Sequence, residues 1–183
     1  DLRGVRCRAN ERLVVGIRIP AGRHPKLLPL EKEEPMIDFG AMLWDRRFME
    51  MAKMVASWSK DPSTKVGAVI VHNRKVVATG YNGFPPGIDD DTRLEDRSRK
   101  YPRIIHAEMN AILQAGHDAR GATMYMFFPA GGAPCANCTK HIIGAGITRL
   151  VVRTQRERTQ WADDQAISVD MIEEAGIIYR KMQ

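Results

Sequence analysis

Cysteine is scarce in this sequence, and long apolar runs are missing altogether. Three cysteines among 183 residues cannot form the dense disulfide framework of a small secreted protein, so we expect a reducing, cytoplasmic location. No apolar run reaches the roughly 18 residues of a transmembrane helix, and we expect no membrane partner. A secretory signal is not visible. Internal repeats and low-complexity tracts are absent as well, which argues against a solenoid or fibrous protein.

What is present fits one globular domain with an unusual start. A length of 183 residues allows a single domain with a substantial core. The net charge of +6 permits a phosphorylated substrate, but we expect no nucleic-acid partner. Residues 1–35 are rich in arginine and then in proline, leucine and glutamate, and the first methionine is Met36. We therefore expect residues 1–35 to be a poorly ordered or non-native N-terminal extension, and residues 36–183 to form the functional domain.

Hydrophobic periodicity predicts alternating helices and strands in that domain. Apolar residues recur at three- and four-residue steps from Trp44 to Trp58, as in an amphipathic helix. Two apolar runs flank a polar turn and predict a β-hairpin with strands 66–71 and 76–81. Further helices are expected at 107–115, 136–145 and 162–175, with strands at 122–128, 148–153 and 177–179. The predicted fold class is α/β, a three-layer α/β/α sandwich with a five-stranded mixed sheet.

Two short motifs carry the chemistry, HAE at 106–108 and PCANC at 134–138. His106, Cys135 and Cys138 form a three-ligand set with one coordination position left open, which suits a catalytic zinc site. Cysteines three positions apart lie on one face of a helix, and a helix start favours thiolates. Glu108 lies roughly 200° around the helix from His106, so it can face a metal-bound water from another side. Both motifs stand at helix starts, and we expect them to converge at one edge of the sheet.

Other interpretations of the two cysteines remain open. A C-x-x-C pair also occurs in redox sites and as half of a structural zinc site. A closed structural site needs a fourth ligand, for which Cys7, His117 and His141 are the candidates. A redox pair would not need the H-x-E motif upstream.

The chain resembles the cytidine deaminase-like superfamily, and within it the deoxycytidylate (dCMP) deaminases, from about Trp44 to Arg180. The pattern H-x-E followed by P-C-x-x-C is the signature of zinc nucleobase deaminases. The narrower likeness lies in the phrases SKDPST at 59–64, GYNGFP at 80–85 and KYP at 100–102. Transfer-RNA adenosine deaminases and riboflavin-pathway deaminases share the zinc motif, but their loop before H-x-E is typically shorter.

This resemblance implies a reaction and the residues that perform it. His106, Cys135 and Cys138 would hold Zn²⁺, which activates water for attack on C4 of the pyrimidine. Glu108 would take a proton from that water, deliver it to ring N3 and then assist the departure of ammonia. The implied activity of the domain is hydrolytic deamination of dCMP to dUMP.

Candidate contacts with the nucleotide are less specific. Asn82 matches the asparagine that contacts the sugar in the superfamily, and it is also a common turn residue in an Asn-Gly pair. Tyr101 and Trp161 are candidates for stacking on the base. Lys65 is a candidate for the phosphate, with a solvated surface charge as its other interpretation. The full set of predicted substrate contacts is Asn82, the backbone N–H of Ala107, Val66, Tyr101, Trp161 and Lys65.

The resemblance also implies partners, and two alternatives to the predicted function stay open. It implies a homohexamer with dCTP and dTTP as effectors. The first alternative is a deaminase of another base, such as free cytidine, deoxycytidine or RNA adenosine. The second is a non-catalytic, nucleotide-sensing deaminase fold. Glu108 favours catalysis, because a binding module need not retain the proton carrier.

Overall fold

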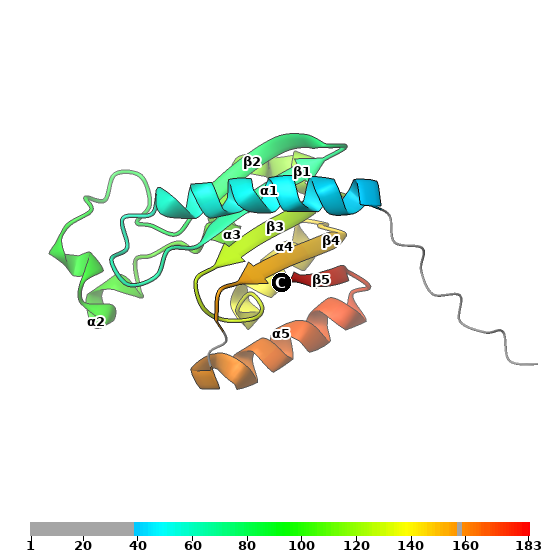
Figure 1. Ribbon diagram of the computed structural model, residues 1–183. Helices are drawn as coiled ribbons and strands as arrows, with labels where there is room; N and C mark the ends of the chain where they lie inside the picture. The colour runs from blue at the N-terminus through cyan, green and yellow to red at the C-terminus, as the bar shows by residue number, and fades with distance from the viewer. Residues whose placement is uncertain (1–38, 157–158) are drawn as a thin grey trace, which may run out of the picture. The chain divides into compact units, whose positions relative to one another are not determined.

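A computed structural model describes residues 39–156 and 159–183 as an α/β fold (Figure 1). The helices of this part are α1 (Phe39–Ser57), α2 (Arg97–Lys100), α3 (Ala107–Ala115), α4 (Ala136–Gly144) and α5 (Ala162–Glu174), with short 3₁₀ turns η1 (Thr92–Leu94), η2 (Gly116–Ala119) and η3 (Thr159–Trp161). The strands are β1 (Gly67–His72), β2 (Lys75–Tyr81), β3 (Thr123–Phe128), β4 (Arg149–Thr154) and β5 (Ile178–Met182). The predicted extension, residues 1–35, lies outside the described residues, so the division at residue 36 stays a prediction.

The five strands form one mixed sheet in the order β2-β1-β3-β4-β5. The predicted hairpin is confirmed, because β1 pairs antiparallel with β2. β1 is also antiparallel to β3, whereas β3, β4 and β5 run parallel. β2 and β3, which α3 separates along the chain, run in the same direction without pairing, since β1 lies between them. The start of β1 and the ends of β2, β3 and β4 consequently meet at one edge of the sheet.

Helices cover both faces of the sheet, which confirms the three-layer prediction (Figure 1). α1 packs on one face, and α3, α4 and α5 cover the other. The alternation along β1 shows the division: Val69 and Val71 belong to the core beneath α1, whereas Ala68 and Ile70 belong to the core beneath α3, α4 and α5. Because both faces of β1 are buried, its sequence is a continuous apolar run instead of an alternating one.

The predicted helices and strands are all present, with shifted ends. α1, for example, begins at Phe39 instead of Trp44. The charged stretch from Asp89 to Lys100, where the apolar pattern predicts neither helix nor strand, contains η1 and α2. Helix α2 is four residues long, and it starts where the Asp96 side chain accepts a hydrogen bond from the backbone N–H of Ser98. Periodicity cannot detect a helix this short.

No helix in the described part of the chain is both long enough and apolar enough to span a membrane. This agrees with the lack of long apolar runs in the sequence.

Two glycines set how closely helices approach the sheet. A Cβ atom at Gly80 in β2 would overlap the carbonyl oxygen of Ala107 and the backbone nitrogen of Ala111, both in α3. A Cβ atom at Gly67 in β1 would overlap the carbonyl oxygen of Ala52 in α1. Because glycine has no Cβ, both helices lie with their backbones directly against strand backbones. The start of α3 is therefore held at a fixed depth on the sheet.

Candidate active site

Three ligand atoms converge where α3 and α4 begin. His106 is the N-cap residue of α3, Cys135 is the N-cap residue of α4, and Cys138 lies in the first turn of α4. The Sγ atoms of Cys135 and Cys138 lie 3.6 Å and 3.3 Å from Nδ1 of His106. The ligand atoms of the three residues all lie within 4.8 Å of one another. The predicted meeting of the two motifs at one edge of the sheet is thus confirmed.

This donor set fits a zinc ion. One imidazole nitrogen and two sulfurs are typical ligands of catalytic zinc sites. Hydrogen bonds from Cys138 and from the imidazole lower the pKa of the Cys135 thiol, which favours a thiolate ligand at this position. Within the described residues, His117 and His141 lie outside the cluster, and neither closes the site as a fourth ligand. Cys7, the other candidate, lies outside the described residues.

Glu108 lies in the first turn of α3 beside the ligands and is only 3% exposed. Burial raises the pKa of its carboxyl group, while the nearby His106 imidazole and a hydrogen bond with Cys138 act in the opposite direction. Its carboxylate does not belong to the ligand cluster. A buried carboxyl group in this position is suited to exchanging protons with a molecule held at the metal.

Asn82 follows β2 and is tied to the loop that precedes β1. Its Oδ1 accepts a hydrogen bond from the N–H of Val66 at 2.7 Å. Its Nδ2 donates to the carbonyl oxygen of Thr64 at 2.8 Å and lies 3.4 Å from Oδ2 of Asp61. Both amide hydrogens are therefore engaged within the protein, while Oδ1 keeps a second lone pair for a sugar hydroxyl. The predicted sugar contact stays a prediction, and Val66 serves as the partner of Asn82.

The other predicted substrate residues differ in exposure. Ala107 is buried as the first residue of α3, where a backbone N–H has no partner within the helix. Tyr101 and Trp161 are 50% and 44% exposed. Lys65 is exposed and donates a hydrogen bond to the carbonyl oxygen of Ser59 at 2.6 Å. Contact of these four residues with a nucleotide stays a prediction.

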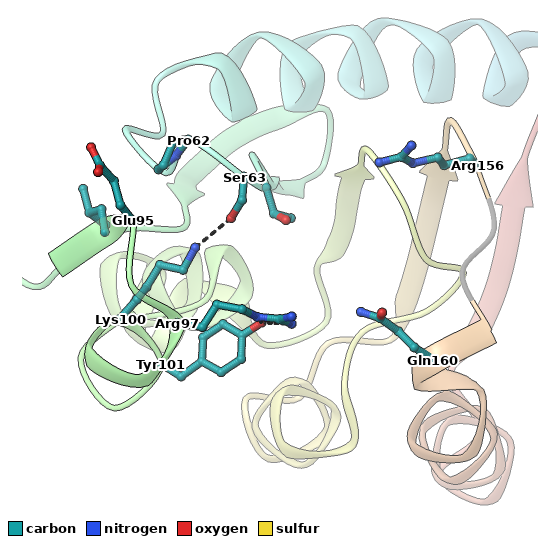
Figure 2. Close-up of a pocket in the computed structure, with 10 residues that line it drawn as sticks. Pro62, Ser63, Glu95, Arg97, Lys100, Tyr101, Arg156 and Gln160 are labelled. Atoms are coloured by element: carbon teal, nitrogen blue, oxygen red, sulfur yellow. Dashed lines mark hydrogen bonds between the residues drawn. The ribbon is translucent and has the colours of Figure 1, made fainter. Parts of the chain in front are cut away.

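An open cavity of about 720 Å³ lies at the same edge of the sheet (Figure 2). The metal ligands are not part of its lining; Thr64, which is hydrogen-bonded to Asn82, connects the cavity with the site. Arg97 and Gln160 point toward each other from opposite sides of the opening, and Arg156 also extends toward it (Figure 2). The lining residues are Pro62, Ser63, Thr64, Leu94, Glu95, Arg97, Lys100, Tyr101, Arg156 and Gln160.

Most of the charged residues around this cavity are not marked by the sequence. Asp61 and Lys100 lie in phrases that carry the family resemblance, SKDPST and KYP, and this was the available signal. Arg97 and Arg156 stand among other charges in polar segments. Nothing in the sequence distinguishes those two arginines from solvated surface residues.

The sequence of this chain matches a known protein family. Residues 42–154 match the family described as the cytidine and deoxycytidylate deaminase zinc-binding region. The matched range contains the three candidate metal ligands and Glu108.

Individual relatives resemble the chain over most of its length. The chain is 40% identical over 136 residues to an uncharacterized deaminase in the luxG 3′ region of Aliivibrio fischeri, covering 73% of this chain and 90% of the relative. It is 36% identical over 146 residues to the deoxycytidylate deaminase of Homo sapiens, covering 75% and 79% of the two chains. The crystal structure of dCMP deaminase from the cyanophage S-TIM5 in complex with dCMP and dUMP matches with a TM-score of 0.61 and 25% identity, over 75% of this chain and 95% of the other.

Proposed function

Since this chain belongs to the cytidine and deoxycytidylate deaminase family, we propose that it hydrolyses dCMP to dUMP and ammonia. The observation that carries the proposal is the convergence of His106, Cys135 and Cys138 beside the buried carboxyl group of Glu108. The choice of dCMP is supported by the identity to human deoxycytidylate deaminase and by the fold match to the phage enzyme that binds dCMP and dUMP.

The proposed chemistry divides between the metal and Glu108. His106, Cys135 and Cys138 would hold a zinc ion, which would supply Lewis acidity and lower the pKa of water at neutral pH. Glu108 accepts a proton from the attacking water and delivers it to N3 of the pyrimidine. Its carboxylate then moves the second water proton to the amino group, which leaves as ammonia while the C4–N bond breaks and the C4 carbonyl forms. Both water protons are accounted for, and Glu108 returns to its starting state.

A 5′-phosphate would find arginine donors in the adjoining cavity. The Cζ atom of Arg97 lies 5.2 Å from the centroid of the Tyr101 ring. Its Nε and Nη2 donate hydrogen bonds to the Tyr101 hydroxyl at 2.9 Å and 2.6 Å. Arg156 extends toward the cavity from the segment that follows β4 (Figure 2). The planar guanidinium fork matches phosphate geometry in two hydrogen bonds. We therefore assign phosphate recognition to Arg97 and Arg156, with Lys65 as a further candidate.

The wild-type protein should prefer dCMP over the nucleosides deoxycytidine, cytidine and adenosine, and CMP is tested beside them. The physical reason is that the cavity beside the site carries arginines, which a nucleoside without phosphate cannot use. Ammonia release measured over this panel gives kcat/KM for each compound. Faster turnover of deoxycytidine than of dCMP would contradict phosphate recognition. Turnover of adenosine instead of any cytosine compound would favour the alternative function, deamination of another base.

Arg156→Ala should weaken the reaction with dCMP much more than the reaction with deoxycytidine. A hydrogen bond to a charged group is worth about 1.5–3 kcal/mol, so kcat/KM for dCMP should fall about 10- to 150-fold. The matched control is Arg153→Ala, because Arg153 lies nearby at the end of β4 but pairs with Glu50 at 2.8 Å. An equal loss on both substrates would show that Arg156 does not recognise the phosphate.

Location and assembly belong to the same proposal. The scarcity of cysteine and a nucleotide substrate support a cytoplasmic enzyme. Resemblance to dCMP deaminases supports a homohexamer that responds to dCTP and dTTP.

A further inference from the structure

Lys100 lines the cavity, yet its side chain is withdrawn from solvent. Lys100 and Asp61 are each only 3% exposed, and Lys100 Nζ lies 3.0 Å from Asp61 Oδ1. The same ammonium group donates to Ser63 Oγ at 2.7 Å, which is the bond drawn in Figure 2. Lysine is seldom buried unless it is paired, and removal of one partner leaves an uncompensated buried charge. This contact is therefore different in kind from an ion pair on the surface.

Asp61 organises the loop that precedes β1. Its Oδ1 accepts hydrogen bonds from the N–H and the hydroxyl of Ser63, both at 2.8 Å, and from the N–H of Thr64 at 3.2 Å. Burial alone raises the pKa of this carboxyl group, but hydrogen bonds from Ser63 and Lys100 outweigh burial and hold the pKa below its usual value. Since Oδ2 lies 3.4 Å from Nδ2 of Asn82, the network extends to the residue predicted to contact the sugar.

The segment of residues 88–103 has few other buried attachments. Leu94 and Lys100 are its only buried residues. The same segment supplies Arg97 and Tyr101 to one side of the cavity. An element with so few buried apolar contacts opens locally at low free energy unless a specific interaction holds it in place. The ion pair provides that interaction, because it joins residue 100 to residue 61 in the loop that precedes β1.

We propose that Lys100 is a positioning residue, whose buried ion pair with Asp61 latches residues 88–103 in place at one side of the cavity that receives the nucleotide. The inference rests on the proposed function, because the latch holds Arg97 and Tyr101 toward the nucleoside monophosphate. Apparent affinity falls in proportion to the latched fraction of molecules. The latch thus acts on substrate binding without touching the reacting atoms.

The test compares Lys100→Met with Lys60→Met. Lys60 joins the same two segments through Asp90 at 2.8 Å, but its side chain is 71% exposed, so it is a matched surface control. In Lys100→Met, KM for dCMP should rise about 10- to 100-fold, as expected when the latched fraction falls to about 1–10%. The value of kcat and the zinc content should stay close to wild type, because saturating substrate restores the latched state. Lys60→Met should match wild type throughout.

Hydrogen exchange provides a readout that needs no substrate. Amides of residues 88–103 should exchange faster in Lys100→Met, while β1 and α3 keep their protection. Unchanged KM and unchanged exchange in this segment would overturn the proposal, as would equal effects of Lys100→Met and Lys60→Met. Failure of the wild type to deaminate dCMP would count against the proposed function alone.

Ser63→Ala keeps the test decisive if Lys100→Met does not fold. This variant removes the acceptor of Lys100 at 2.7 Å but leaves the ion pair with Asp61. We expect a smaller rise in KM and faster exchange in residues 88–103 only. Because Ser63 Oγ accepts from Lys100 and donates to Asp61, its loss weakens the ion pair itself, and wild-type exchange in this segment would reject the latch.

Discussion

Glu108→Gln should abolish turnover while leaving zinc bound. Glutamine keeps the size of the buried side chain but can neither accept nor deliver the proton that the reaction requires. General acid–base catalysis is worth about 10²–10⁴-fold, and Glu108 serves two transfers. We therefore expect kcat to fall by about 10⁴-fold or more. Ammonia release and metal analysis of the same preparation measure the two properties.

The control for this experiment is Glu174→Gln, which makes the same chemical change at an exposed position of α5. It should have wild-type activity and zinc content. A Glu108→Gln enzyme within a few-fold of wild type would show that the carboxylate has only a structural role. Loss of zinc in that variant would instead make Glu108 part of metal binding.

Cys138→Ser should remove the metal and, with it, the activity. Cys138 is 1% exposed, and its Sγ lies 3.3 Å from Nδ1 of His106. Bulk water therefore cannot take the place of this sulfur as a metal ligand. Residues that only support a metal ligand are worth about 10- to 100-fold in affinity, and loss of a ligand should exceed that range. Metal analysis after dialysis should find about one zinc per wild-type chain and almost none in the variant.

Cys7→Ser is the informative control for the metal site, because Cys7 is the one cysteine of the chain outside the PCANC motif. Its zinc content should equal that of the wild type. Zinc loss in Cys7→Ser would indicate a closed site with four protein ligands. Full zinc retention and intact activity in Cys138→Ser would reject the assigned site itself.

The metal ligands could be predicted from the sequence because few residue types can bind zinc. His106, Cys135 and Cys138 are marked by chemistry and by local spacing, and both motifs stand at helix starts where the backbone fixes their direction. The helices and strands were predictable for a similar local reason. Apolar periodicity over ten or more residues, as in α1, reports directly on which face is buried.

The residues around the cavity could not be predicted, because their roles depend on distant partners. Lys100 is one of several charges in its segment, and only its pairing with Asp61 sets it apart. The position of β1 between β2 and β3 is also a long-range property, which an alternation of helices and strands leaves open. Asn82 shows the same limit, since its amide is engaged with Thr64 and Val66 from a separate loop.

Gly80 gives this enzyme a vulnerable position that contains no reactive group. A single methyl group there would overlap the backbone of α3 at Ala107 and Ala111, and the helix could relieve the overlap only by lifting away from β2. His106 and Glu108 would move with the helix, while the cysteines on α4 would stay behind. Metal–ligand distances tolerate deviations of only about 0.2 Å, so alanine at position 80 would act like the loss of a ligand. A survey that judges related chains by their ligand motifs alone would classify such a protein as an active deaminase.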